Sequence, residues 1–254
     1  QAATDAIAAT GRGGVVGLPT SNHDFTRLVA GPRDAEQARV AHVLTMTWPA
    51  LPSVYYGDEI GMRYVPGTPT LEGSRLGPAY DRAGSRTPMQ WGDLPADPYG
   101  PGRPADSTYL PEDPDPERPT VAAQVDDGDS LLRLVRDLIA LRHDDPRLDA
   151  AAPVEVLATG YPLAYVRGGT LAVLLNPGGA AVRFPLAGAV GGRQVLARGF
   201  RAETDNGGAE VVHLDGHGYA VLDLAVAQRP TADGRAWYAH RSGARTGLAL
   251  APWN

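Results

Sequence analysis

The first half of the chain alternates short apolar runs with longer amphipathic segments. Val15 to Thr20 and Ser53 to Tyr56 are rich in β-branched, aromatic and other apolar residues, which predicts two short buried strands. Apolar residues at helical spacing predict helices over 35–47 and 130–143. Asp34, with a glutamine three residues later, has the capping-box pattern that begins the first helix. The order strand, helix, strand, helix predicts parallel α/β units.

The pattern changes near Pro153, where short apolar runs begin to alternate with turn signals. Spacing of this kind predicts a small antiparallel β-sandwich. The predicted strands are Val154–Leu157, Leu163–Val166, Leu171–Asn176, Ala181–Leu186, Val211–Leu214 and Tyr219–Leu224. We therefore expect a chain of α/β plus all-β class, with an α/β part over 1–150, the sandwich over 151–227 and a poorly ordered tail over 228–254.

The segment from 62 to 128 is rich in Pro, Gly and Asp and shows no periodicity. A connection this long inside a compact domain is typical of a functional loop or of disorder. Its aromatic residues favour a packed functional loop. They are Tyr64, Tyr80, Trp91, Tyr99 and Tyr109.

Composition excludes several classes of function. The formal net charge of −6 argues against nucleic acid or an anionic membrane as partner. The sequence contains no run of eighteen apolar residues, so it predicts no segment that spans a bilayer. The absence of cysteine excludes disulfides and thiolate chemistry. No nucleotide-binding glycine motif, serine-nucleophile elbow or metal-ligand spacing is present, so we expect neither a cofactor nor a metal. With no signal peptide in the sequence given, the cytoplasm is slightly favoured and the compartment otherwise stays open.

The first candidate site is Asn22-His23-Asp24 with Arg27, just past the carboxyl end of the first predicted strand. This is where a parallel α/β barrel places its chemistry. A carboxylate beside a neutral imidazole can bind two sugar hydroxyls, and an ionised one beneath an anomeric carbon stabilises an oxocarbenium-like charge. Arg27 is expected to hold Asp24 ionised by lowering its pKa. The alternative is that Asn22 or Asp24 caps a helix and that His23 is an ordinary loop histidine.

Two further clusters are weaker candidates. Asp58 and Glu59 are adjacent and point in opposite directions, so they cannot serve one atom as a general acid and base. We expect one of them to brace the barrel floor or a loop. In the long loop, Arg86 supplies a fixed charge and Trp91 a flat apolar face on which a pyranose ring could pack. The alternative is an ordinary packed loop.

These motifs together resemble the alpha-amylase superfamily, glycoside hydrolase family thirteen. Asn22 to Asp24 is similar to the family's fourth sequence region at the end of barrel strand seven, and Val54 to Gly61 is similar to barrel strand eight. Arg86 to Trp91 resembles the loop of the alpha-glucosidase, trehalose synthase and oligo-1,6-glucosidase branch. Residues 130–142 resemble the last barrel helix, and the sandwich resembles the family's C-terminal β-domain. The resemblance covers residues 15–225 in the right order.

The resemblance implies a role for each matching residue. Asp24 would be the catalytic transition-state stabiliser, binding the 2- and 3-hydroxyls of the glucose at the cleavage point. His23 would bind the same ring, and Asn22 would shape the turn. Arg27 and Arg86 would lie near the substrate. Members of the family are retaining enzymes that act on α-glucosidic bonds.

The chain departs from the family pattern in one decisive respect. The family needs an Asp nucleophile after strand four and a Glu general acid after strand five, and no motif in this chain matches either. Retaining chemistry requires two carboxyl groups about 5 Å apart. We therefore expect the C-terminal portion of a (β/α)8 barrel, with strands seven and eight and their helices, which is inactive alone. Its partners would be an α-glucoside or malto-oligosaccharide and the missing N-terminal part of the barrel.

Two alternatives stay open from the sequence. The chain could be one half of a split enzyme, or a non-catalytic carbohydrate-binding or structural remnant. The sequence does not distinguish hydrolysis from glucosyl transfer, nor one α-glucosidic linkage from another.

Overall fold

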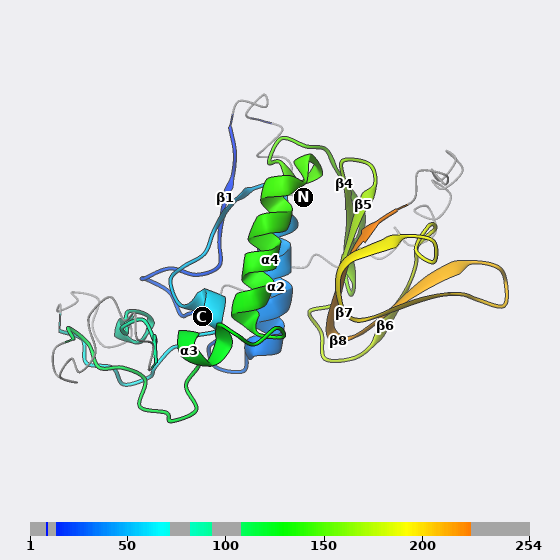
Figure 1. The fold of residues 1–254 in the computed structure, drawn as a ribbon. Coiled ribbons are helices and arrows are strands. Elements are labelled where there is room, and N and C mark those ends of the chain that lie inside the picture. The colour runs from blue at the N-terminus through cyan, green and yellow to red at the C-terminus, as the bar shows by residue number, and fades with distance from the viewer. Residues whose placement is uncertain (1–8, 10–13, 72–81, 93–107, 225–254) are drawn as a thin grey trace, which may run out of the picture.

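The computed structural model describes residue 9 and residues 14–71, 82–92 and 108–224. The helices and strands before residue 150 are short, apart from two long helices (Figure 1). They are β1 (Gly17–Pro19), α2 (Ala35–Thr47), β2 (Leu51–Ser53), the 3-10 helices η1 (Asp58–Ile60) and η3 (Ala83–Ser85), α3 (Val121–Gln124), α4 (Leu131–Asp144) and the 3-10 helix η5 (Pro146–Leu148).

β1 and β2 pair in parallel, from Gly17 opposite Leu51 to Pro19 opposite Ser53, and α2 connects them. This is the strand, helix, parallel strand unit that the sequence predicts. Both strands pair only with each other among the described residues. Leu51 is 60% exposed. The expectation that these strands are buried is therefore wrong for this chain, because no further described strand covers them.

The second predicted strand was placed too late in the sequence. The strand ends at Ser53, whose carbonyl accepts the Thr20 amide at 2.9 Å. The Tyr55 amide, two residues further along, donates to the Thr20 hydroxyl at 3.1 Å instead of to a backbone carbonyl of β1. Because a side chain takes this donor, the backbone ladder stops, and the Asp58 amide then closes a turn onto the Tyr55 carbonyl at 3.0 Å.

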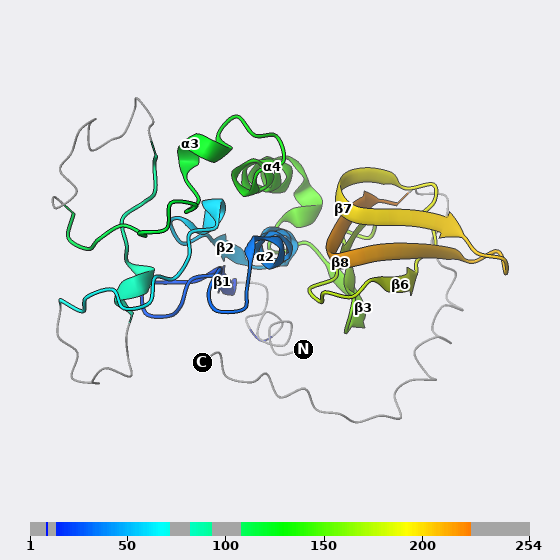
Figure 2. The ribbon, with the colours of Figure 1, turned by 90° about the horizontal axis from the view of Figure 1, so that it is seen from below.

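Both predicted helices are confirmed. α2 begins with the complete capping box, in which Asp34 accepts the Gln37 amide and Gln37 accepts the Asp34 amide. α4 begins after Ser130, whose hydroxyl accepts the Arg133 amide. The two helices lie side by side (Figures 1 and 2). The Arg142 guanidinium of α4 donates to carbonyls at and just beyond the end of α2, which satisfies backbone acceptors that the helix leaves open.

The second part of the chain forms one six-stranded antiparallel sheet. Its strands are β3 (Val154–Thr159), β4 (Leu163–Arg167), β5 (Leu171–Leu175), β6 (Val182–Pro185), β7 (Arg193–Thr204) and β8 (Glu210–Asp223). β8 pairs with β6 through its first half, with β5 through its second half and with β7 along its length. The prediction of a sandwich with two strands over 211–224 is therefore corrected: one long strand holds a curled sheet together, and β7 was not predicted.

The helices and the sheet share one hydrophobic core. α2 and α4 contribute Val43 and Leu138, and β4, β5 and β8 contribute Tyr165, Val173 and Val221 among others. The Thr47 hydroxyl at the end of α2 lies 2.7 Å from the Tyr165 hydroxyl. A second apolar cluster lies within the curled sheet itself. The division near residue 150 remains a prediction, and the predicted tail over 228–254 lies outside the described residues.

Within the part of the chain that the structure describes, no helix combines the length and the apolar character needed to cross a membrane.

Replacing Leu138 with Ala is expected to lower the free energy of unfolding by about 2–5 kcal/mol, because it opens a cavity in the shared core. Ile139 is the matched control, since it follows Leu138 on the same helix and is 50% exposed. Ile139→Ala should change the free energy by less than about 1 kcal/mol. Urea denaturation followed by circular dichroism measures both, and equal effects of the two variants would contradict the shared core.

Candidate functional site

Asp24 lies in the loop that follows β1, at the carboxyl end of the parallel strand pair. The Asn22 side-chain oxygen accepts the Asp24 amide at 2.8 Å, which makes an Asx turn. This turn holds the two residues between Ser21 and Asp24 in a tight bend. The expectation that Asn22 shapes the turn agrees with this geometry.

Two arginines from the long loop contact the Asp24 carboxylate. Arg82 donates from Nη1 to Asp24 Oδ1 at 2.5 Å, and Arg86 donates from Nη2 to the same oxygen at 3.2 Å. Arg86 also donates from Nε to the His23 carbonyl at 3.0 Å. On the other side, His23 Nε2 lies 3.4 Å from Asp24 Oδ2. The structure therefore brings His23, Asp24 and Arg86 together, as the sequence predicts.

These contacts determine the charge state of Asp24. Burial alone would raise the pKa of the Asp24 carboxyl, but the hydrogen bond from Arg82 and the charges of His23, Arg82 and Arg86 outweigh it. The pKa of Asp24 consequently lies below its ordinary value, and the carboxylate is ionised at neutral pH. About a third of the side chain (34%) is exposed, so a ligand can still reach it.

Arg27 lies elsewhere than predicted. Its side chain is completely buried, donates from Nη1 to the Tyr56 carbonyl at 2.6 Å and lies 3.7 Å from Asp58. Its guanidinium also lies over the Tyr55 and Tyr56 rings, 5.1 and 4.7 Å from their centroids. The expectation that Arg27 pairs with Asp24 is therefore wrong: Arg82, which the sequence reading missed, takes that place at the carboxylate. That Arg27 lies near the substrate stays a prediction.

Asp58 has the bracing role that we expected of one of the two adjacent carboxylates. It is 1% exposed and accepts hydrogen bonds from the Thr20 and Ser21 hydroxyls, each at 2.6 Å. Burial raises the pKa of the neighbouring Glu59, and the charge of Asp58 adds to this shift. That the two carboxylates cannot serve one atom as acid and base stays a prediction.

The loop from Arg86 to Trp91 is fastened to the strand ends. The Tyr55 hydroxyl donates to the Ser85 carbonyl at 3.2 Å, and the Tyr56 hydroxyl donates to the Thr87 carbonyl at 2.7 Å. Trp91 packs against a small core that contains Ile60, Met62, Val121 and Leu132. Its ring therefore takes part in a packed loop, while its partly exposed face leaves the contact with a sugar a prediction.

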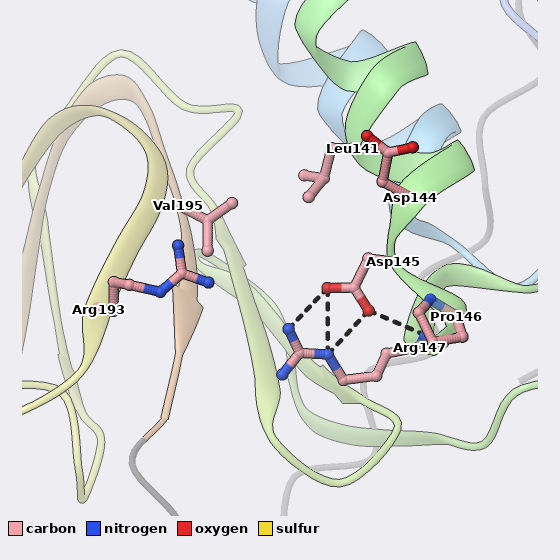
Figure 3. Close-up of a pocket in the computed structure, with 7 residues that line it drawn as sticks. All are labelled: Leu141, Asp144, Asp145, Pro146, Arg147, Arg193 and Val195. Carbon is pink, nitrogen blue, oxygen red and sulfur yellow. Dashed lines mark hydrogen bonds and ion pairs between the residues drawn. The ribbon is translucent and has the colours of Figure 1, made fainter.

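An open crevice of about 500 Å³ lies at the far end of α4, away from these residues (Figure 3). Two of its lining residues are paired, since Arg147 lies 2.6 Å from Asp145, and Arg147 also lies 2.7 Å from Asp223 of β8. None of the predicted site residues lines it. We interpret these ion pairs as a structural contact between the end of α4 and the sheet.

No group of three or more His, Cys, Asp or Glu side chains suited to a metal ion occurs within the ranges that the structure covers. The site at Asp24 consists of one carboxylate, one imidazole and two guanidinium groups. Such a set can bind neutral hydroxyl groups and stabilise positive charge that develops beside the carboxylate.

Comparison with known proteins gives a consistent result. Residues 3–151 match the family model described as alpha amylase, catalytic domain. Trehalose synthase/amylase TreS of Mycobacterium tuberculosis is 36% identical over 143 residues, which are 53% of this chain and 21% of that protein. Maltase A2 of Drosophila melanogaster is 32% identical over 121 residues, which are 48% of this chain and 20% of that protein.

Solved structures show the same fold at lower identity. A trehalulose synthase mutant in complex with Tris superimposes with a TM-score of 0.68 at 21% identity, covering 88% of this chain and 46% of that chain. An isomaltulose synthase mutant from Erwinia rhapontici in complex with D-glucose superimposes with a TM-score of 0.70 at 21% identity, covering 88% and 45%. The chain thus spans about a fifth of the curated relatives and less than half of these structures.

The Asp24 carboxyl is expected to titrate below its ordinary value of 3.8, and Arg82→Gln should raise its pKa by removing the shortest hydrogen bond. The stabilisation from these contacts is present above the unfolded-state pKa and is lost as pH falls through the depressed folded-state pKa. Carbon-13 NMR titration of the side-chain carboxyl measures the shift. Arg118→Gln, which removes a pair with Glu112 instead, is the control and should leave Asp24 unchanged.

Proposed function

Because the chain belongs to the alpha-amylase family, we propose that it is the C-terminal part of a retaining enzyme that acts on α-glucosidic bonds. Membership confirms the resemblance drawn from the sequence motifs, including the trehalose synthase and glucosidase branch to which the matched relatives belong. The observation that carries the proposal is the state of Asp24, an ionised and partly exposed carboxylate at the carboxyl end of the strand pair.

Asp24 acts in this proposal as the transition-state stabiliser. Cleavage of a glycosidic bond passes through an oxocarbenium-like state, and a fixed negative charge beside the anomeric carbon lowers its energy. A protonated Asp24 could not do this, so the arginines that lower its pKa also preserve its function. Both arginines contact Oδ1, while Oδ2 is directed to His23. We assign the binding of sugar hydroxyls to Asp24 and His23, with Arg86 at the same edge.

The nucleophile and the general acid must come from elsewhere. Retaining cleavage requires two carboxyl groups about 5 Å apart on either side of the bond, and no motif of this chain matches either of them. Among the described residues β1 and β2 pair with no other strand, and Val15 before β1 and Leu51 in β2 are 58% and 60% exposed. We propose that the remaining βα units of the barrel pair with these strand edges and supply both groups.

In the complete enzyme, meaning this chain together with the rest of the barrel, Asp24→Asn is expected to lower kcat toward an aryl α-glucoside by on the order of 10³-fold or more. The substitution keeps the shape of the side chain and removes its charge. Asp137→Asn on the exposed face of α4 is the control and should retain full activity. Near-normal turnover of Asp24→Asn would exclude the role proposed for this carboxylate.

The chain as given is expected to show no turnover of maltose or an aryl α-glucoside, because a stabilising carboxylate without its partners gives negligible catalysis. The measurement is release of glucose or aryl alcohol by purified protein over hours, compared with the Asp24→Asn variant. Turnover that follows the protein through purification and disappears in that variant would show that the chain is catalytic alone. It would therefore contradict the proposed dependence on the rest of the barrel.

A further inference from the structure

The segment from Thr20 to Arg27, which carries Asp24 near its centre, is held at its beginning by Asp58. The Thr20 and Ser21 hydroxyls both donate to Asp58 Oδ2 at 2.6 Å. Hydrogen bonds to an ionised carboxylate are shorter and stronger than those between neutral groups. The Thr20 hydroxyl also accepts the Tyr55 amide, so this end of the segment is fixed to the residues just after β2.

The same carboxylate holds the other end of the segment. Arg27 Nη1 lies 3.7 Å from Asp58 Oδ1, and both side chains are completely buried. A buried charge is strongly destabilised when it loses its partner, so Asp58 contributes to the position of Arg27 together with the Tyr56 carbonyl. Asp58 thus contacts residues on both sides of Asp24 without contacting Asp24 itself.

Asp58 is itself fixed by its surroundings. It begins η1, and its carbonyl lies 3.0 Å from Nε2 of His42, a buried residue of α2. The preceding Gly57 has a φ of 85°, and a Cβ atom there would lie 2.3 Å from Met62 Sδ and 3.1 Å from Arg27 Nη1. Only glycine allows the chain to turn here while the Arg27 guanidinium approaches the Tyr56 carbonyl.

We infer that Asp58 is a positioning residue for Asp24, which fixes the place of that carboxylate by gripping both ends of the segment that carries it. The inference rests on the role of Asp24 proposed above. It extends the bracing role of Asp58 to the geometry of the reacting carboxylate. A displacement of about 1 Å at a reacting group can cost on the order of 10²-fold in rate, so such a grip has a measurable consequence.

The test replaces Asp58 with Asn, which keeps the side-chain shape and removes the charge that holds Arg27. In the chain as given, the pKa of Asp24 should move up toward its ordinary value of 3.8, because the carboxylate is displaced from Arg82 and Arg86. In the complete enzyme, kcat should fall by on the order of 10²-fold while KM changes less. Carbon-13 NMR titration and steady-state kinetics measure the two effects.

Asp113→Asn is the matched control. Asp113 is also a buried aspartate that pairs with an arginine, Arg63, at 3.1 Å, and it lies outside the site. A merely structural effect would appear equally in both variants as a loss of stability. If Asp58→Asn is folded and the titration of Asp24 matches that of the Asp113→Asn protein, the inference is overturned.

If the Asp58→Asn protein does not fold, Ser21→Ala is the second test. It removes one hydroxyl donor and leaves the buried ion pair intact. A smaller upward shift in the pKa of Asp24 supports the inference, and an unchanged pKa in a folded protein overturns it. The titration needs no activity, so it separates the two ideas: a shifted Asp24 in Asp58→Asn together with full activity of Asp24→Asn would refute the proposed function alone.

Discussion

The arrangement of the loops at the strand ends depends on one buried carboxylate, that of Asp58. Asp58 accepts hydrogen bonds from the Thr20 and Ser21 hydroxyls just after β1 and faces the charge of Arg27. Residues on both sides of the Asp24 turn therefore contact the same side chain. The contact between His42 Nε2 and the Asp58 carbonyl connects Asp58 to α2, which packs on α4. Loop residues 20–27 are therefore connected to α2 through Asp58 and His42.

Two aspartates in neighbouring loops have opposite environments and opposite uses. Asp58 is removed from water: its Oδ2 accepts the Thr20 and Ser21 hydroxyls, and its Oδ1 faces the Arg27 guanidinium at 3.7 Å. Asp24 stays partly exposed, and the guanidinium groups of Arg82 and Arg86 gather on one of its oxygens. A sugar that binds Asp24 therefore meets a carboxylate that is already ionised and oriented, and little reorganisation is left for the transition state.

The sequence predicts those features that arise from local chemistry. The capping residues and apolar spacing define α2 and α4, and the position of Asn22, His23 and Asp24 after a strand predicts where they gather. Arg82 was missed because its partner lies 58 residues away and no periodicity links the two. Arg27 was misplaced because proximity in sequence to Asp24 suggested a pair, whereas the side chain turns inward to Asp58.

The sheet was misread for a similar reason. The glycines and histidines within β8 resemble a turn between two strands, yet pairing with β5, β6 and β7 keeps the strand continuous. Polar and charged residues interrupt β7 (RQVLARGFRAET), and none of its residues is fully buried, so it carries little apolar signal. Its existence follows from long-range pairing with β8, which no local pattern reports.

The core that α2 and α4 share with the sheet limits how such a chain can be rearranged during evolution. Tyr165, Val173 and Val221 lie on the sheet face that meets the helices, so a recombination event that removed the sheet would leave an apolar surface on both partners. An exchange of the sheet for an unrelated module would have to rebuild that surface at once. The two parts are therefore expected to be inherited together, with substitutions on one side compensated on the other.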